Sequence, residues 1–254
     1  MNIKYSISLW NFTHYMWRPP LEEVLERIQQ RGYGVELWRH WSEERDLFED
    51  RERGKLAHIT REMRVSVHSC GPKNREEHRS QVDAARDLGA EVIVLHPADL
   101  SPEGKGSPDI SLARDAVAYA GEHDVRMALE NGPLPFLTEA VQAVPNLEIC
   151  LDVGHVYFEE ESMGQFLDSL KSRLTHLHLQ DILPGEDREL PYTLRDRYVP
   201  GRGGIPQGDW ELFVETLDAI DFDGWGVFEI RPQSPWQTAR GGKEFLERLR
   251  NGGK

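Results

Sequence analysis

The segment LTHLHLQD (174–181) places two histidines two residues apart, between leucines, and ends in an aspartate. Residues two apart in a β-strand lie on the same face, so His176 and His178 would point one way and the leucines the other. A buried imidazole needs a hydrogen-bond partner or a metal ion. The pattern therefore indicates a polar site on one face of a strand, whose partners must come from elsewhere in the chain.

Further residues that bind metals or move protons follow at the ends of other predicted strands. Glu130 closes VRMALE, Asp152 closes LEICLD, and Glu229 lies in FEIRP. Carboxylates gathered in a poorly solvated pocket raise one another's pKa values and cost several kcal/mol. A divalent cation removes that cost. We therefore predict a metal site of Glu130, Asp152, His178 and Glu229, with Mn²⁺ as the expected ion and Mg²⁺, Co²⁺ or Zn²⁺ as alternatives.

A second group of polar and aromatic residues falls at the same strand ends. We expect these residues to contact substrate: Trp10, Trp38, His68, His96, His155, Asp181 and Arg231. Each has an ordinary structural alternative, because a lone histidine often hydrogen-bonds within the fold and tryptophans, Trp17 included, can pack under loops. The succession of ligand-type side chains on six strand ends favours a site. His176, one pleat deeper, is expected to support a ligand from behind.

Hydrophobic periodicity predicts eight strands that alternate with eight helices. The strands are expected at 4–10, 33–38, 64–70, 91–97, 125–132, 147–155, 174–181 and 224–232, and the helices at 21–32, 43–63, 75–88, 110–122, 136–144, 162–172, from 209 onward and at 237–250. Mostly apolar strands alternating with helices form a parallel sheet covered by helices. We predict an α/β fold, a (β/α)8 TIM barrel that forms one domain over residues 1–254. A doubly wound sheet is the alternative, but no glycine-rich phosphate fingerprint follows the first strand.

The predicted barrel explains why distant residues should meet. The carboxyl ends of all its strands form one rim, where the active sites of such barrels lie. The long connection 181–208 is expected to be functional, because connections of this length are rare in compact domains. Asp209 is expected to cap the helix that follows it.

Composition narrows the classes of partner. The net charge of −14, from 44 acidic and 30 basic residues, disfavours nucleic acids and anionic membranes. No apolar run is long enough for a membrane helix, and the N-terminal MNIKYSISLWNF lacks a signal-peptide pattern. Two cysteines, Cys70 and Cys150, give no disulfide framework. We expect a cytoplasmic protein with a small sugar or polyol substrate, and a homodimer as an open alternative.

The chain resembles the xylose isomerase-like TIM barrels at five motifs in order, namely LENGP (129–133), LDVGH (151–155), HLHLQD (176–181), PGRGGIPQGDW (200–210) and FEIRP (228–232). This superfamily holds sugar isomerases and epimerases, inosose dehydratases and apurinic endonucleases. By the resemblance, Glu130, Asp152, His178 and Glu229 match its metal-binding quartet. The glutamates that match Glu130 and Glu229 also move the proton in the ketose epimerases, where the histidine that matches His155 contacts substrate.

Two departures from the family pattern bear on the reaction. The apurinic endonucleases carry an Asp-x-His pair after the seventh strand, whereas residues 182–208 contain no histidine and read DRYVPG at the corresponding place. The ketose epimerases place an arginine shortly after the metal histidine, where this chain reads ILPGE (182–186). His68 and His96 match positions used by members with several metal ions, so a second ion bridged by Glu130 stays an open alternative.

These observations together predict a metal-dependent isomerase or epimerase of a keto-sugar or keto-inositol. Glu130 and Glu229 would remove and return a proton next to the carbonyl, through an enediolate stabilised by the metal. His155 and Asp181 would fix hydroxyl groups of the substrate. The alternatives are a dehydratase on the same scaffold, a hydrolase or endonuclease with several metal ions, and a sugar-binding barrel without catalysis.

Overall fold

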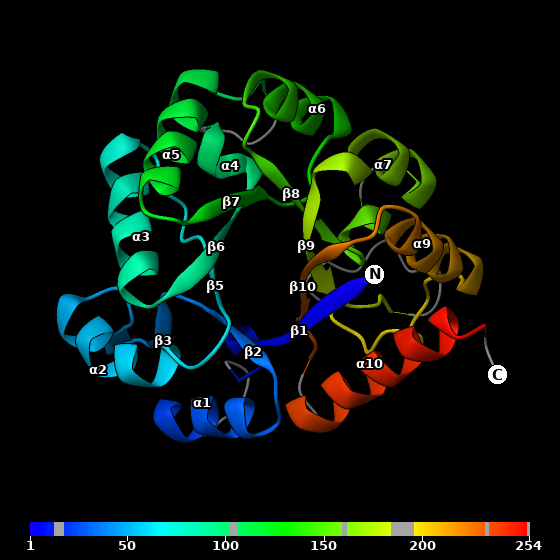
Figure 1. Cartoon of the computed structure of the whole chain (residues 1–254), viewed down its shortest axis with the longest axis horizontal. Helices are drawn as coiled ribbons and strands as arrows, with labels where there is room; N and C mark the ends of the chain where they lie inside the picture. The colour runs from blue at the N-terminus through cyan, green and yellow to red at the C-terminus, as the bar shows by residue number, and fades with distance from the viewer. Residues whose placement is uncertain (13–17, 102–105, 159–161, 184–195, 232–233, 253–254) are drawn as a thin grey trace.

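Eight parallel strands close into a barrel. The computed structural model describes residues 1–12, 18–101, 106–158, 162–183, 196–231 and 234–252. Around the barrel, the strands follow in the order β1 (Asn2–Ser8), β10 (Asp223–Phe228), β9 (Leu174–Leu179), β8 (Glu148–Asp152), β7 (Arg126–Leu129), β6 (Ala90–Leu95), β5 (Val65–His68) and β2 (Gly34–Leu37). Strand β1 closes the ring because it pairs with both β10 and β2. The predicted single-domain TIM barrel is confirmed (Figure 1).

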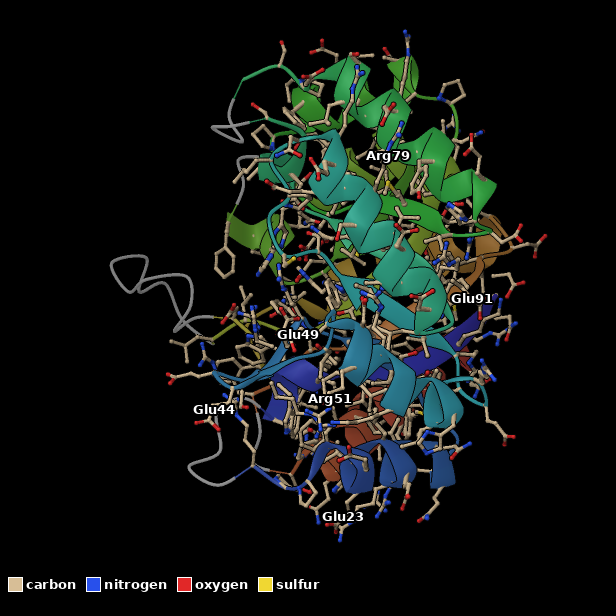
Figure 2. All side chains as sticks on the ribbon, turned by 90° about the vertical axis from the view of Figure 1, so that its left-hand side faces the viewer. Glu23, Glu44, Glu49, Arg51, Arg79 and Glu91 are labelled. Carbon is tan, nitrogen blue, oxygen red and sulfur yellow. The ribbon has the colours of Figure 1, made fainter. Side chains whose placement is uncertain are left out.

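Helices surround the barrel between successive strands. They are α1 (Leu21–Gln30), α2 (Asp50–Thr60), α3 (Arg75–Asp87), the short α4 (Pro97–Leu100), α5 (Ile110–Glu122), α6 (Leu134–Ala143), α7 (Met163–Leu170), α9 (Gln207–Ala219) and α10 (Pro235–Arg250), with 3-10 turns η1 (Leu9–Phe12), η2 (His155–Phe158) and η3 (Lys171–Arg173). Their outer faces carry charged side chains such as Glu23, Arg51 and Arg79 (Figure 2). In the described part of the chain, no helix has the length and apolar character required to cross a membrane.

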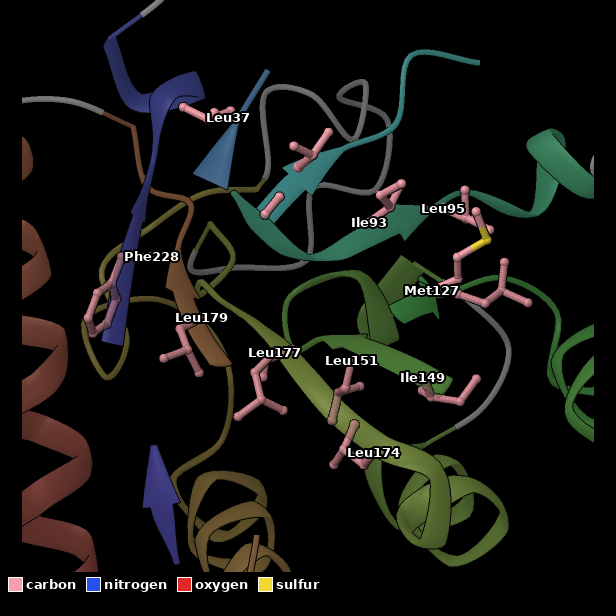
Figure 3. Close-up of a cluster of buried hydrophobic side chains, with 14 of the residues drawn as sticks. Leu37, Ile93, Leu95, Met127, Ile149, Leu151, Leu174, Leu177, Leu179 and Phe228 are labelled. Carbon is pink, nitrogen blue, oxygen red and sulfur yellow. The ribbon is translucent and has the colours of Figure 1, made fainter. Parts of the chain in front are cut away.

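The two faces of each strand have different tasks. Leu177 and Leu179 join the large apolar core between the sheet and the helices (Figure 3). The residues that alternate with them, His176 and His178, point into the barrel, as the alternation of strand side chains requires. A second, small apolar cluster lies inside the barrel, towards the amino ends of the strands. It consists of Val92, Val94, Ala128, Cys150 and Trp225. It precedes the polar interior residues along the strands, so these lie towards the carboxyl ends.

Two local predictions from sequence are wrong. The helix expected at 43–63 begins only at Asp50, because residues 40–46 form the antiparallel pair β3 (His40–Ser42) and β4 (Arg45–Asp46). Arg45 binds Glu22 of α1 and Glu52 of α2, so its charge is matched across elements and not along one helix. Pro206, not Asp209, occupies the N-cap of α9.

The strands are also shorter than expected at their carboxyl ends. Strands β7, β8 and β10 end at Leu129, Asp152 and Phe228, so the residues just beyond them lie in loops. Residue 232, the predicted end of the last strand, lies outside the described residues. Asp152 and His178 are the last inward-facing residues of paired strands, whereas Glu130 and Glu229 follow directly after their strands, so the polar side chains gather at the rim of the barrel.

Candidate metal centre

Three of the four predicted metal ligands meet inside the rim. Glu130, Asp152 and His178 each place one ligand atom within 4.8 Å of the others. His178 Nδ1 lies 2.8 Å from Glu130 Oε1 and 3.8 Å from Asp152 Oδ2. All three side chains are buried. Residues separated by up to 48 positions in sequence thus share one point in space, since parallel strands bring their carboxyl ends together.

Glu229, the fourth predicted ligand, faces the same point from the loop after β10. Its Oε2 lies 3.9 Å from His178 Nδ1. Its Oε1 is buried and has no hydrogen-bond partner among the residues that the structure describes. A buried carboxylate oxygen without a partner is costly, and a cation beside it would remove that cost. Three carboxylates and one imidazole nitrogen therefore fit a divalent metal ion.

Burial and neighbouring charges shift the pKa values of these groups in opposite directions. Burial, reinforced by the negative charges of Glu130 and Glu229, raises the pKa of Asp152 despite nearby His155. For Glu130, burial acts to raise the pKa, but His178, His68 and His96 outweigh it and hold the pKa well below its usual value. The imidazoles thus balance the carboxylates, and a divalent cation would compete with the proton at Nδ1 of His178.

Two asparagines fix the main chain at two of the candidate ligands, Asp152 and Glu229. The Asn131 side chain donates to the carbonyl of Asp152 (2.9 Å) and accepts from its backbone N–H (2.8 Å). The Asn11 side chain brackets Glu229 in the same way, because it donates to the carbonyl before it (2.9 Å) and accepts from the N–H after it (2.8 Å). Each asparagine ties the main chain at one candidate ligand to the end of the neighbouring strand.

Arg197, from the connection 181–208, lies beside the candidate metal centre. Arg197 has a left-handed backbone (φ 65°), and its N–H donates to Gln180 Oε1 at 2.5 Å. Its guanidinium lies over the Trp10 ring, 3.9 Å from the centroid, and Nη2 is 3.7 Å from Glu229 Oε2. The family pattern predicts an arginine at 182–186, whereas the arginine of this chain lies 11 or more positions later, at Arg197. Gln180, which also donates to Asp152 Oδ2, shares the inward face of His176 and His178 and could have been noticed there.

Asp196, also missed from sequence, organises two of the predicted substrate contacts. Arg231 Nη2 donates to Asp196 Oδ1 at 2.9 Å. His155 lies between two carboxylates, with Nδ1 3.4 Å from Asp152 Oδ2 and Nε2 3.6 Å from Asp196 Oδ2. Burial acts to lower the pKa of His155, but the two aspartates outweigh it and raise the pKa to about 9. His155 and Arg231 therefore lie beside the candidate centre as positively charged donors.

His68 and His96 face the second oxygen of Glu130. His96 Nε2 lies 2.8 Å and His68 Nε2 3.7 Å from Glu130 Oε2, and the three side chains form a second possible ligand group. Trp38 stacks on His68 with a centroid distance of 4.0 Å and donates through Nε1 to Ser8 Oγ. Trp17 lies outside the described residues. The structure thus brings the other predicted aromatic and histidine residues to the same rim.

Asp181 is arranged differently from the other predicted substrate contacts. Its two oxygens accept hydrogen bonds from four backbone N–H groups of the connection, those of Ile182, Gly201, Gly203 and Ile205, at 2.8 to 3.0 Å. The side chain is fully buried. Asp181 therefore shapes the turn that returns the connection to the barrel, and we do not propose substrate contact for it.

We expect Asp181→Asn to lower the free energy of unfolding by about 2 to 4 kcal/mol, because an amide N–H₂ would face two backbone N–H donors. Urea unfolding followed by circular dichroism measures this. Asp168→Asn is the matched control, since Asp168 is 81% exposed and its change should stay within about 0.5 kcal/mol. Equal stability of the two variants would contradict the role of Asp181.

His176 packs edge-on against the candidate ligand His178, with 5.6 Å between the ring centroids. Its Nε2 lies 3.1 Å from Glu36 Oε2, and Glu36 in turn faces His178. His176 therefore lies behind His178, both through this ring contact and through Glu36, and its predicted support of a ligand stays a prediction. Glu36 stands at the end of a predicted strand, but its position in the sequence alone does not show which residues it faces.

A parallel barrel that gathers carboxylates and histidines at the carboxyl ends of its strands defines the class of (β/α)8 proteins with a polar site at that rim. The chain belongs to the xylose isomerase-like TIM barrel family, whose model matches residues 33–249.

Solved structures with the same fold cover nearly the whole chain. The IolI protein with a bound zinc atom has a TM-score of 0.74 at 16% identity, covering 99% of both chains. An L-ribulose 3-epimerase has a TM-score of 0.72 at 14% identity, covering 99% of this chain and 95% of its own. The probable 3-DHS dehydratase AsbF from Bacillus anthracis has a TM-score of 0.66 at 16% identity, covering 97% and 98%. No curated protein matches the chain.

Proposed function

We propose that the protein is a metal-dependent isomerase or epimerase of a keto-sugar or keto-inositol. The observation that carries this is the order of the candidate ligands around the barrel. They come from four successive strand ends, β10, β9, β8 and β7, with Glu229 and Glu130 on the outer two. Two carboxylates that flank one site suit a reaction in which one group takes a proton and another gives one. The zinc in IolI and the activity of L-ribulose 3-epimerase support this reading.

The residues of the chain divide the reaction among them. Glu130, Asp152, His178 and Glu229 would hold the ion, which when bound polarises a carbonyl and stabilises the developing negative charge. One of Glu130 and Glu229 removes the proton from the carbon beside the carbonyl, and the other returns one. His155 and Arg197 donate hydrogen bonds to substrate oxygens. Trp10 and Trp38 form walls on which the apolar face of a sugar can rest.

Arg197→Lys should lower kcat/KM by about 10- to 100-fold, mainly through KM, because lysine keeps the charge but loses the planar fork that binds two oxygens. Steady-state kinetics on a confirmed substrate measures this. Arg202→Lys, five residues later in the same connection but exposed, should behave as wild type. An unchanged KM in the Arg197 variant would remove this arginine from the substrate site.

A hydrolase with several metal ions is the second candidate function. The group of His68, His96 and Glu130, whose ligand atoms lie within 4.8 Å of one another, favours it. A dehydratase is a third outcome of the same proton removal, and the structural likeness to AsbF, described as a probable 3-DHS dehydratase, supports it.

Elemental analysis followed by a substrate panel separates these functions. We expect about one divalent ion per chain, and exchange of solvent deuterium next to the carbonyl when keto-sugars or inososes are incubated in D₂O with Mn²⁺. Two or more ions together with phosphodiester cleavage would replace the isomerase by the hydrolase. An unsaturated product would identify the dehydratase, and tight sugar binding without an ion would leave only a binding protein.

Three finer points belong to the same proposal. We propose Mn²⁺ as the ion because a centre rich in carboxylates suits this metal. We propose the cytoplasm as the compartment, since Cys70 and Cys150 are both free thiols. We propose no nucleic-acid partner, because the chain carries a net charge of −14.

A further inference from the structure

Glu36 contacts the candidate ligand His178 on the side that faces away from the other ligands. Nδ1 of His178 points to the carboxylates, 2.8 Å from Glu130 Oε1 and 3.9 Å from Glu229 Oε2. The opposite nitrogen, Nε2, lies 3.2 Å from Glu36 Oε1 and 3.3 Å from Glu36 Oε2. The two nitrogens of one imidazole thus have separate partners.

The contact crosses the interior of the barrel. Glu36 comes from β2 and His178 from β9, which are separated by β1 and β10 in the ring. Glu36 is fully buried, and so are its other partners. Ser66 Oγ donates to Glu36 Oε2 at 3.1 Å, and His176 Nε2 lies 3.1 Å from the same oxygen. These contacts hold the carboxylate in one place, below His178.

A charge at this depth needs a reason beyond packing. An apolar side chain of the same size would avoid the desolvation cost of a buried carboxylate, which is several kcal/mol. Towards the amino ends of the strands, the interior is filled by such side chains, those of the apolar cluster of Val92, Val94, Ala128, Cys150 and Trp225. The presence of a glutamate under His178 indicates that its charge acts on a neighbour.

We infer that Glu36 is a positioning residue for the metal centre. Its carboxylate accepts a hydrogen bond from Nε2–H of His178 and so keeps the Nδ1 lone pair turned towards the ion. A neutral imidazole carries one proton, and the partner of one nitrogen decides which nitrogen is left to bind. A carboxylate behind the ring also fixes its orientation and makes it a stronger ligand. The inference rests on the metal centre of the proposed function and not on its substrate.

Metal affinity tests this role without any substrate. Metal-free wild type, Glu36→Gln and Glu36→Met are titrated with Co²⁺ in competition with a chromogenic chelator. We expect Glu36→Met to weaken binding about 100-fold, because no acceptor remains, and Glu36→Gln about 10-fold, because the amide oxygen still accepts but carries no charge. Ser66→Ala removes a donor to Glu36 and leaves its contact with His178, so its affinity should stay within about threefold of wild type.

The Nε2 proton of His178 supplies a second readout. In the Zn²⁺-loaded wild type we expect a far-downfield, slowly exchanging NMR signal from this proton. The signal should move upfield in Glu36→Gln and be absent in Glu36→Met. A purely structural role of Glu36 would leave the signal and the Co²⁺ affinity unchanged in both variants, and that result would overturn the inference.

The outcomes separate this inference from the proposed function. Where Glu36→Met fails to fold, Glu36→Gln decides, since it keeps the size of the side chain. If the wild type binds Co²⁺ but acts on no keto-sugar, the isomerase proposal is wrong. The role of Glu36 still holds in that case, provided that the Glu36 variants bind Co²⁺ more weakly than the wild type. Wild type that binds no Co²⁺ overturns the metal centre and this inference together.

Discussion

Glu130→Gln and Glu229→Gln should each lower kcat by about 10²- to 10⁴-fold while the protein remains folded, because glutamine keeps the shape of the side chain but cannot take up a proton. Both glutamates are buried and lie within 4 Å of His178 Nδ1. Steady-state kinetics on a substrate found in the panel measures the effect. Circular dichroism and thermal unfolding check that the fold persists.

The glutamate variants need two controls. Glu91→Gln makes the same chemical change on the outside of the barrel, where Glu91 is exposed (Figure 2), and should leave kcat unchanged. Metal content measured in each variant separates the loss of a proton carrier from the loss of a ligand. If either variant retains wild-type turnover with its ion bound, the scheme with two glutamates is wrong.

Removal of the ion should abolish activity and lower the melting temperature by about 5 to 10 °C. An ion at 100 times its Kd stabilises the folded state by about 2.7 kcal/mol, and each kcal/mol corresponds to about 2 to 4 °C in a domain of this size. The physical cause is the set of buried carboxylates Glu130, Asp152 and Glu229, which repel one another unless a cation lies between them.

Differential scanning calorimetry before and after treatment with a chelator measures this effect. Added Mn²⁺ should restore both the melting temperature and the activity. His178→Ala is the control, since this variant loses the imidazole ligand and should respond much less to the chelator. A melting temperature that is the same with and without chelator in the wild type would show that these residues form an ordinary buried polar cluster.

The barrel could be predicted because its signal repeats. Each strand is short and apolar, each is followed by an amphipathic helix, and a parallel sheet is the fold that hides both faces of such strands. Helix α1 illustrates this, since Leu21, Val24, Leu25 and Ile28 recur at helical spacing and are all buried. The candidate ligands could be found for the same reason, because a barrel brings strand ends together wherever they fall in the sequence.

The missed residues depend on contacts between distant segments. Glu36 is recognisable only once β2 is known to face β9 across the interior. Arg197 precedes a turn at 200–205 whose backbone N–H groups, up to 24 positions from Asp181, donate to the carboxylate of Asp181. The segment 40–46 forms a hairpin and not part of a helix, and the partners of its Arg45 lie on α1 and α2. No local pattern encodes such pairings.

The paired hydrogen bonds of Asn11 and Asn131 have a consequence for the evolution of such barrels. The side chains of both asparagines hydrogen-bond the main chain at a candidate metal ligand, at the point where the loops begin. The loops that follow these hydrogen bonds can change in length or sequence without changing the distances between the acidic side chains. New substrates can therefore be acquired by exchanging loops, while the inherited geometry around the cation is kept.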